Sequence, residues 1–263
     1  AVLYGVNVEE DGIDTEKVEA LLKEHKNIKI IYTIATFQNP SGITMSLKKR
    51  KKLLALAEKY DVMIFEDNPY GELRFAGEEV PTIKSMDKDC RVIYGGSFSK
   101  VLSPGLRLGF VSCDPALMER MIICKQAEDV HTTQLTQMLA YEFFTKYDID
   151  EHIALLRKTY GEKCSFMMEC MDKYFPASVT HTHPQGGLFI FCTMPDGYDS
   201  TEVMQKALDK GVAFVPGVTT MIDTDAVYST FRLNYSVSTF EQIEKGIKLL
   251  GEVLKETVGE ANV

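Results

Sequence analysis

The segment from Arg91 to Val111, RVIYGGSFSKVLSPGLRLGFV, constrains the fold of this chain more than any other. An apolar run stops at two glycines, a polar stretch with two serines and one lysine follows, and a second apolar run begins at Leu108. This order predicts a strand, a polar turn and a second strand. The glycines let the backbone approach a ligand, and the hydroxyl, amine and guanidinium groups suit a phosphate. Lys100 alone indicates little, because a loop lysine is ordinarily a solvated charge.

Two further segments place polar groups directly after an apolar strand. The sequence FQNPSG at 37–42 follows the run 29–34, and EDNPYG at 66–71 follows the run 62–65. The carboxyl ends of parallel strands share one edge of a sheet, and ligands bind there in α/β proteins. We therefore expect both polar segments to lie at a ligand-binding edge.

Strands alternating with amphipathic helices predict an α/β domain with a mainly parallel sheet. The expected strands of this part are 3–8, 29–34, 62–65, 92–94 and 108–113, and the helices begin at Asp14 or Thr15, at Ser46 within 44–60, at 115 and at 134. A long helical pattern over 153–174 then leads to strands 179–183, 188–192, 212–215 and 230–235 and helices 201–210 and 239–255. The second pattern predicts a small α+β domain, with the boundary near Asp150.

Four blocks, TFQNPSG, EDNPYGELRF, GSFSKVLSPGLRLGF and FRLNY, resemble in order and spacing the fold-type-I pyridoxal-phosphate (PLP) enzymes. The similarity is greatest to class I/II aminotransferases of the aminoadipate and kynurenine type. It covers nearly all 263 residues, but only the later part of the family's length. It implies an incomplete large PLP-binding domain over 1–150, a linker helix with a small C-terminal domain over 151–263, and a homodimer.

The resemblance assigns each requirement of PLP to a residue of this chain. Lys100 matches the Schiff-base lysine, whose free amine then moves the substrate proton. Asp67 matches the partner of the pyridine nitrogen, and Tyr70 and Asn39 match the groups that bind the phenolic oxygen. The matching phosphate ligands are Ser97, Ser99 and Arg107. PLP serves as an electron sink, so the implied reaction moves an amino group from an L-amino acid to a 2-oxo acid.

Arg232 matches the arginine that binds the α-carboxylate of the substrate with two hydrogen bonds. Asn39 is assigned to the substrate as well as to the cofactor. Because Arg232 lies in the small domain, we expect substrate binding to close that domain over the ring. Each residue has an ordinary alternative: Asp67 as a strand-end turn residue, Asn39 with Pro40 as a plain turn, and Arg232 as a surface charge. The joint occurrence of the four blocks favours the functional interpretation.

Two other functions fit the same motifs. A PLP-dependent lyase or decarboxylase-like enzyme holds the cofactor in the same way, because these motifs bind the cofactor and do not fix the reaction. The fold also forms the effector-sensing domain of transcription regulators whose DNA-binding domain precedes it. The substrate side chain stays open, since in relatives the pocket walls come partly from earlier residues and from a second subunit.

Relatives begin with an N-terminal arm, a phosphate-binding glycine turn at a helix start and an aromatic residue stacked on the ring. None of these is found before Leu3. We therefore expect a truncated form of a longer aminotransferase that binds PLP poorly or not at all by itself. By the same analogy an empty strand position separates strand 3–8 from strand 29–34, which leaves unpaired edges.

The composition, 25% charged and 45% hydrophobic residues with a formal net charge of −9, is that of a soluble globular protein and argues against a nucleic-acid partner. The basic run 48–52 is interpreted as a solvated helix face. The six cysteines form no C-x-x-C pair, which indicates reduced, buried thiols. No apolar run approaches the ~20 residues that cross a bilayer, and no secretory pattern opens the chain, so we expect a cytoplasmic protein with no membrane partner.

Two histidines and a group of methionines have weaker functional interpretations. His181 and His183 are two apart and share a face of the expected strand, but no third ligand lies nearby, so we expect no metal. Met167, Met168 and Met171 are expected to belong to the core of their helix.

Overall fold

The computed structural model describes residues 1–259, and the chain divides into two compact units. The parallel-sheet unit comprises 6–38 and 44–157. The antiparallel-sheet unit comprises 1–5, 39–43 and the chain from Lys158 on. Helix α6 (Ile149–Tyr174) contributes residues to both units, up to Arg157 to the first and from Lys158 to the second.

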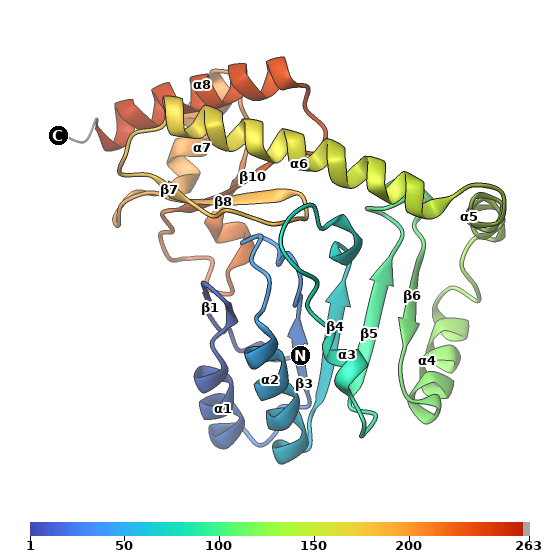
Figure 1. Ribbon diagram of the computed structural model, residues 1–263. Coiled ribbons are helices and arrows are strands. Elements are labelled where there is room, and N and C mark those ends of the chain that lie inside the picture. Colours follow the sequence, from blue (N-terminus) through green and yellow to red (C-terminus); the bar gives the residue numbers. More distant parts are fainter. Residues whose placement is uncertain (260–263) are drawn as a thin grey trace. The chain divides into compact units, whose positions relative to one another are not determined.

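The parallel-sheet unit contains four strands in the order β3, β4, β5, β6 (Figure 1). They are β3 (Ile30–Thr33), β4 (Met63–Asn68), β5 (Val92–Ser97) and β6 (Gly109–Ser112). The first three are parallel and β6 is antiparallel to β5, so the prediction of a mainly parallel α/β sheet is confirmed. The helices are α1 (Thr15–Glu24), α2 (Leu47–Tyr60), α3 (Ile83–Met86), α4 (Pro115–Glu128) and α5 (Gln134–Lys146), with 3₁₀ turns η1 (Gly71–Leu73) and η2 (Pro104–Leu106).

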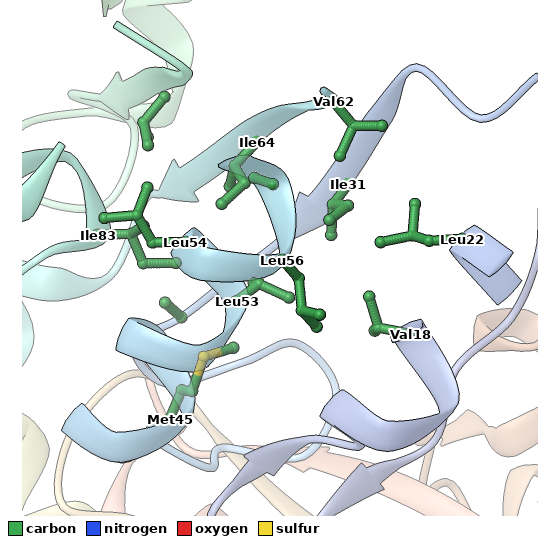
Figure 2. Packing of buried hydrophobic residues seen from close by; sticks show 13 residues of the cluster. Val18, Leu22, Ile31, Met45, Leu53, Leu54, Leu56, Val62, Ile64 and Ile83 are labelled. Atoms are coloured by element: carbon green, nitrogen blue, oxygen red, sulfur yellow. The ribbon is translucent and has the colours of Figure 1, made fainter. Parts of the chain in front are cut away.

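Helices α1 and α2 pack their apolar faces against β3 and β4 (Figure 2). Their starts are fixed locally, because the side chain of Asp14 accepts hydrogen bonds from the first amides of α1 and Ser46 does the same for α2. The buried face brings together Val18, Leu22, Ile31, Leu53, Leu56 and Ile64. Burial of a side chain of this size stabilises the fold by about 1.5–3 kcal/mol, so this layer holds the strands in register.

The prediction of a strand over 3–8 was wrong. Of this range only Val8 lies in a strand, in the short hairpin of β1 (Val8–Glu9) and β2 (Gly12–Ile13). Val2 and Leu3 are 73% and 71% exposed. Alternation makes a strand only where a neighbouring strand satisfies its amides and carbonyls, and within the described residues this segment has no such neighbour.

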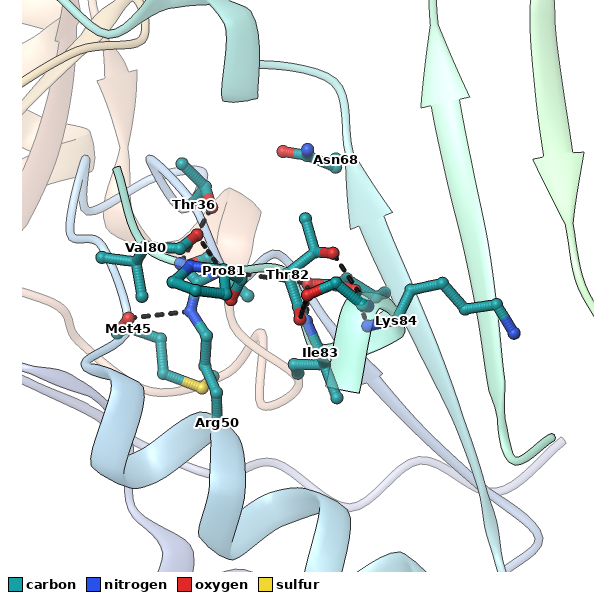
Figure 3. A network of polar contacts seen from close by, with 12 residues as sticks. Thr36, Met45, Arg50, Asn68, Val80, Pro81, Thr82, Ile83 and Lys84 are labelled. Carbon is teal, nitrogen blue, oxygen red and sulfur yellow. Dashed lines mark hydrogen bonds and ion pairs between the residues drawn. The ribbon is translucent and has the colours of Figure 1, made fainter. Parts of the chain in front are cut away.

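The interpretation of 48–52 as a solvated helix face agrees with the exposure of Lys48 and Lys51 but was wrong for Arg50, whose side chain is fully buried. Its guanidinium donates five hydrogen bonds, at 2.8–3.3 Å, to the carbonyls of Met45, Val80, Pro81 and Ala35 and to the hydroxyl of Thr36 (Figure 3). Burial lowers the pKa of Arg50 to about 10, so it remains a cation at neutral pH. Arg50 therefore ties α2 to the segment after β3 and to the segment before α3.

The antiparallel-sheet unit has the strand order β7, β8, β10, β9 and is the expected α+β fold. The strands are β7 (Thr180–His181), β8 (Phe189–Thr193), β9 (Val215–Pro216) and β10 (Thr230–Asn234), and the helices are α7 (Ser200–Asp209), α8 (Phe240–Val258) and the later part of α6, with the 3₁₀ turn η3 (Gly217–Thr220). Met167 and Met171 of α6 are buried as expected, and Met168 is half-buried.

The cysteines differ in exposure. Cys164, Cys170 and Cys192 are buried free thiols, as predicted, whereas Cys90 and Cys124 are exposed and Cys113 is half-buried. An apolar run in the sequence does not distinguish a core position from an exposed one on a helix such as α4. Over residues 1–259, no helix is both long enough and apolar enough to cross a membrane.

Candidate active site

Strands β4 and β5 end at the same edge of the parallel sheet and bring several of the predicted residues to it. Asp67 is the penultimate residue of β4, and Ser97 is the last residue of β5. In the parallel register Asp67 lies opposite Gly95, two residues before Ser97. The carboxylate and the first hydroxyl are therefore neighbours at the edge where α/β proteins bind ligands.

The connection from β5 to β6 folds into a cluster of hydrogen-bond donors. The amide of Ser99 donates to Oγ of Ser97 at 3.2 Å, and Nη1 of Arg107 donates to Oγ of Ser99 at 3.3 Å. Arg107 has φ of +52° and also donates to the carbonyl of Pro104 at 3.2 Å, which holds the guanidinium over the turn. Two hydroxyls and one guanidinium thus converge on one place, a donor set suited to a phosphate dianion.

Lys100 follows this cluster directly in the chain and is half-buried. Its ammonium has no hydrogen-bond or ion-pair partner within residues 1–259. A lysine that pairs with no carboxylate keeps its amine available for covalent chemistry, which is what its predicted role requires.

Asp67 has a partner that the sequence did not indicate. Oη of Tyr32 on β3 donates a hydrogen bond to Oδ2 of Asp67 at 2.7 Å, and in the described chain Oδ1 of Asp67 accepts none. Tyr70 follows β4 by two residues, its ring is buried, and its carbonyl accepts the amide of Leu73 at 2.8 Å to close η1. The structure thus places Tyr32, Asp67 and Tyr70 at or just beyond the strand ends.

The antiparallel-sheet unit contains the other two predicted residues and brings them into contact. Nη1 of Arg232, on β10, donates to Oδ1 of Asn39 at 2.7 Å. The guanidinium of Arg232 also lies over the ring of Phe189, 4.2 Å from its centroid. Phe189 was not predicted as a site residue. Arg232 pairs with Phe191 in the antiparallel register, so Phe189 is its diagonal neighbour on the same face.

The two histidines lie close together without forming a metal site. Their rings are 4.8 Å apart, and Nε2 of His181 lies 3.4 Å from Oδ1 of Asp172. In the part of the chain that the structure describes, no group of three or more His, Cys, Asp or Glu side chains is arranged to hold a metal ion.

The family described as aminotransferase class I and II matches residues 2–250. The chain belongs to this family. Aromatic-amino-acid aminotransferase 1 of Thermococcus litoralis is 43% identical over 252 residues, which are 96% of this chain and 60% of that protein. An uncharacterized HTH-type transcriptional regulator of Bacillus subtilis is 31% identical over 97% of this chain and 52% of its own length.

Solved structures agree with this assignment. The crystal structure of Pyrococcus horikoshii kynurenine aminotransferase, in complex with PMP and with KYN as substrate and KYA as product, is 40% identical and has a TM-score of 0.91. The comparison covers 98% of this chain and 64% of that one. The chain therefore spans about 60% of the length of the relatives it matches.

Proposed function

We propose that this chain acts in PLP-dependent transfer of an amino group from an L-amino acid to a 2-oxo acid. One observation carries the proposal: Asp67 lies at the end of β4 and Ser97 at the end of β5, on the carboxyl edge of the parallel sheet, and Ser99, Lys100 and Arg107 follow in the connection directly after Ser97. The close relatives named as aminotransferases support the same activity.

The residues at this edge fit PLP. Its phosphate needs several donors, and Ser97, Ser99 and Arg107 supply them within one turn. Its ring nitrogen needs an anionic acceptor, and Oδ1 of Asp67 is available in the described chain. Its aldehyde needs an amine, and Lys100 offers one. When bound, PLP supplies an electron sink for the charge that remains after a substrate loses its α-proton.

Each residue then has a defined task. Lys100 would hold the cofactor through its Nζ, and as a free amine it would accept and return the α-proton as a general base. Asp67 keeps the ring nitrogen protonated. Arg107 orients the phosphate with a planar fork of donors, which a lysine lacks. Tyr70 is proposed as a donor to the phenolic oxygen, as in the resemblance.

Arg232 and Asn39 are proposed to hold the substrate. Two contacts fix the orientation of the Arg232 guanidinium. Its Nη1 lies 2.7 Å from Oδ1 of Asn39, and the ring of Phe189 lies under it. A guanidinium held in this way binds a carboxylate with two parallel hydrogen bonds. Asn39 is also proposed to donate to the phenolic oxygen of the cofactor.

Three further features are parts of the same proposal. They are a homodimer as the active assembly, the cytoplasm as the location, and the division into a partial PLP-binding domain over 1–150 and a small domain over 151–263. The six free cysteines support the second feature, because disulfides are rare in a reducing compartment, and the resemblance to the family supports the other two.

The proposal is tested by adding PLP to the chain and following the visible absorption band of the bound cofactor. Wild type is expected to develop the band, and Lys100→Ala is expected to lose it. A band that depends on Lys100 would also show that the expectation of poor PLP binding by this chain alone, made from the sequence, was wrong. Lys51→Ala, a change at an exposed lysine of α2, is the control and should behave as wild type. An unchanged band in Lys100→Ala would contradict the assignment.

A second assay defines the reaction. An aminotransferase forms a new amino acid only when a 2-oxo acid is supplied, whereas a lyase releases pyruvate without one. A sensing domain of a regulator would bind the cofactor and catalyse neither reaction.

A further inference from the structure

Tyr32 is placed by strand pairing so that it reaches Asp67. In the parallel register Tyr32 lies opposite Phe65, and Asp67 follows Phe65 by two residues, so the three side chains share one face of the sheet. The rings of Tyr32 and Phe65 stack with centroids 5.9 Å apart and planes at 16°. The stacking directs the phenol along the strand toward the carboxylate, where Oη lies 2.7 Å from Oδ2.

This hydrogen bond has a chemical consequence for the carboxylate. A carboxylate offers two oxygens, and a ring nitrogen requires only one of them. With the phenol on Oδ2, the plane of the carboxylate is fixed and Oδ1 becomes the acceptor that faces a ligand. Tyr32 is 57% exposed, and its partial burial, the hydrogen bond to Asp67 and the negative charge of Asp67 all raise its pKa, so the phenol remains a donor at neutral pH.

We propose that Tyr32 is a positioning residue for the cofactor, which holds Asp67 with one oxygen directed at the ring nitrogen of PLP. The inference rests on the proposed function, since it assigns Asp67 to that nitrogen. Tyr32 acts through Asp67. The alternative is a purely structural hydrogen bond that ties β3 to β4. Removal of the phenol oxygen weakens PLP binding if Tyr32 positions Asp67, and leaves PLP affinity unchanged if the bond is only structural.

Tyr32→Phe removes this bond and keeps the stacked ring. Tyr60→Phe is a matched control, because Oη of Tyr60 donates to the carboxylate Oε1 of Glu19 at 3.0 Å in the same unit. The dissociation constant for PLP is measured by titration of the visible band. We expect Tyr32→Phe to bind PLP about tenfold more weakly, in keeping with the loss of a hydrogen bond to a charged group, and Tyr60→Phe to bind as wild type.

A double-mutant cycle shows whether the effect passes through Asp67. In the Asp67→Ala background, Tyr32→Phe is expected to cause no further loss of affinity. Equal PLP affinity in wild type and Tyr32→Phe, or a loss that persists in the Asp67→Ala background, would overturn the positioning role and leave the proposed function intact. Absence of any Lys100-dependent binding by wild type would overturn both.

A readout without cofactor tests the geometry. In the chain labelled with ¹³C at the tyrosine Cζ position, the Tyr32 signal is identified by its loss in Tyr32→Phe and followed as the pH rises. It should titrate at a higher pH than exposed tyrosines, and at a lower pH in Asp67→Ala than in wild type. A Tyr32 titration that Asp67→Ala does not move would refute the proposal.

Discussion

Replacing Arg50 by methionine removes the guanidinium that joins α2 to two other segments. Three of its hydrogen bonds are fully buried, to the carbonyl oxygens of Met45 and Ala35 and to Oγ1 of Thr36, at 2.8–2.9 Å. Its Nη1 also lies 4.0 Å from Oε1 of Glu66. Methionine reaches only as far as the Nε position of arginine and donates nothing. The carbonyl of Met45 and the hydroxyl of Thr36 therefore lose this donor, whereas the carbonyl of Ala35 still accepts the amide of Met45 at 2.8 Å.

The expected loss follows from those acceptors. Each buried acceptor left without its donor costs about 1–3 kcal/mol, so these two cost about 2–6 kcal/mol, and the space left by the shorter side chain adds a cavity cost. The cation no longer has to be desolvated, and this offsets several kcal/mol. We expect the free energy of unfolding to fall by about 3 kcal/mol, a large part of the 5–15 kcal/mol typical of a domain. Arg50→Lys should lie between wild type and Arg50→Met, because an ammonium keeps the charge but not the fork.

The measurement is urea unfolding followed by circular dichroism at 222 nm, since the chain has no tryptophan. Lys51→Met is the control: it removes one positive charge from the next position of α2, but the side chain is exposed. It should change the free energy of unfolding by no more than about 0.5 kcal/mol. If Arg50→Met and Lys51→Met unfold within about 1 kcal/mol of each other, with equal denaturant slopes, the reasoning about the buried network is refuted.

Three further outcomes can be measured on the same chain. Arg107→Lys should weaken PLP binding about tenfold, because the planar fork is lost, and an unchanged dissociation constant would remove Arg107 from the phosphate site. Burial alone would raise the pKa of Asp87, but two backbone amides and one ammonium outweigh it, so this pKa lies below its usual value. The stability that Asp87 contributes is therefore present above a pH of about 4 and lost as the pH falls further. The urea midpoints of wild type and Asp87→Asn should therefore converge on acidification. A difference between the two midpoints that does not change with pH would contradict this. Gly42→Ala should destabilise the antiparallel-sheet unit by about 1–3 kcal/mol, since φ is +71° and the added Cβ would lie 2.9 Å from the carbonyl oxygen of Phe189. Gly197 also has a positive φ, but its added Cβ would have no neighbour within 4 Å, so Gly197→Ala should cost less. Equal losses of stability would show that the close contact at Gly42 is unimportant.

The sequence was most informative where structure is decided locally. Asp14 and Ser46 cap α1 and α2 as predicted, because a cap needs only the side chain and the next few amides. The strand ends at Asp67 and Ser97 were also indicated, since each strand is a short apolar run that stops at polar residues. These strand ends indicate a common ligand-binding edge, and the resemblance to the family supplies the roles of the residues there.

Features that depend on distant neighbours were not predictable in the same way. The contact between Tyr32 and Asp67 requires the register of β3 against β4, which no local pattern encodes. Arg50 lies in a run of five basic residues, and only the packing of three segments around it shows that one of the five is buried. The strand expected over 3–8 failed for the same reason, because its pairing partner is not a property of its own sequence.

The guanidinium of Arg50 donates four of its five hydrogen bonds to main-chain carbonyl oxygens. Every amino acid possesses such an oxygen, so Met45, Ala35, Val80 and Pro81 are recognised by the path of their main chain and not by their identity. In a mutational scan Val80 and Pro81, which are half-buried and exposed, should accept many substitutions, whereas position 50 should accept almost none. Met45 and Ala35 should accept few, because their own side chains lie in the core. A single residue, Arg50, therefore fixes the main-chain path of the segments that it contacts.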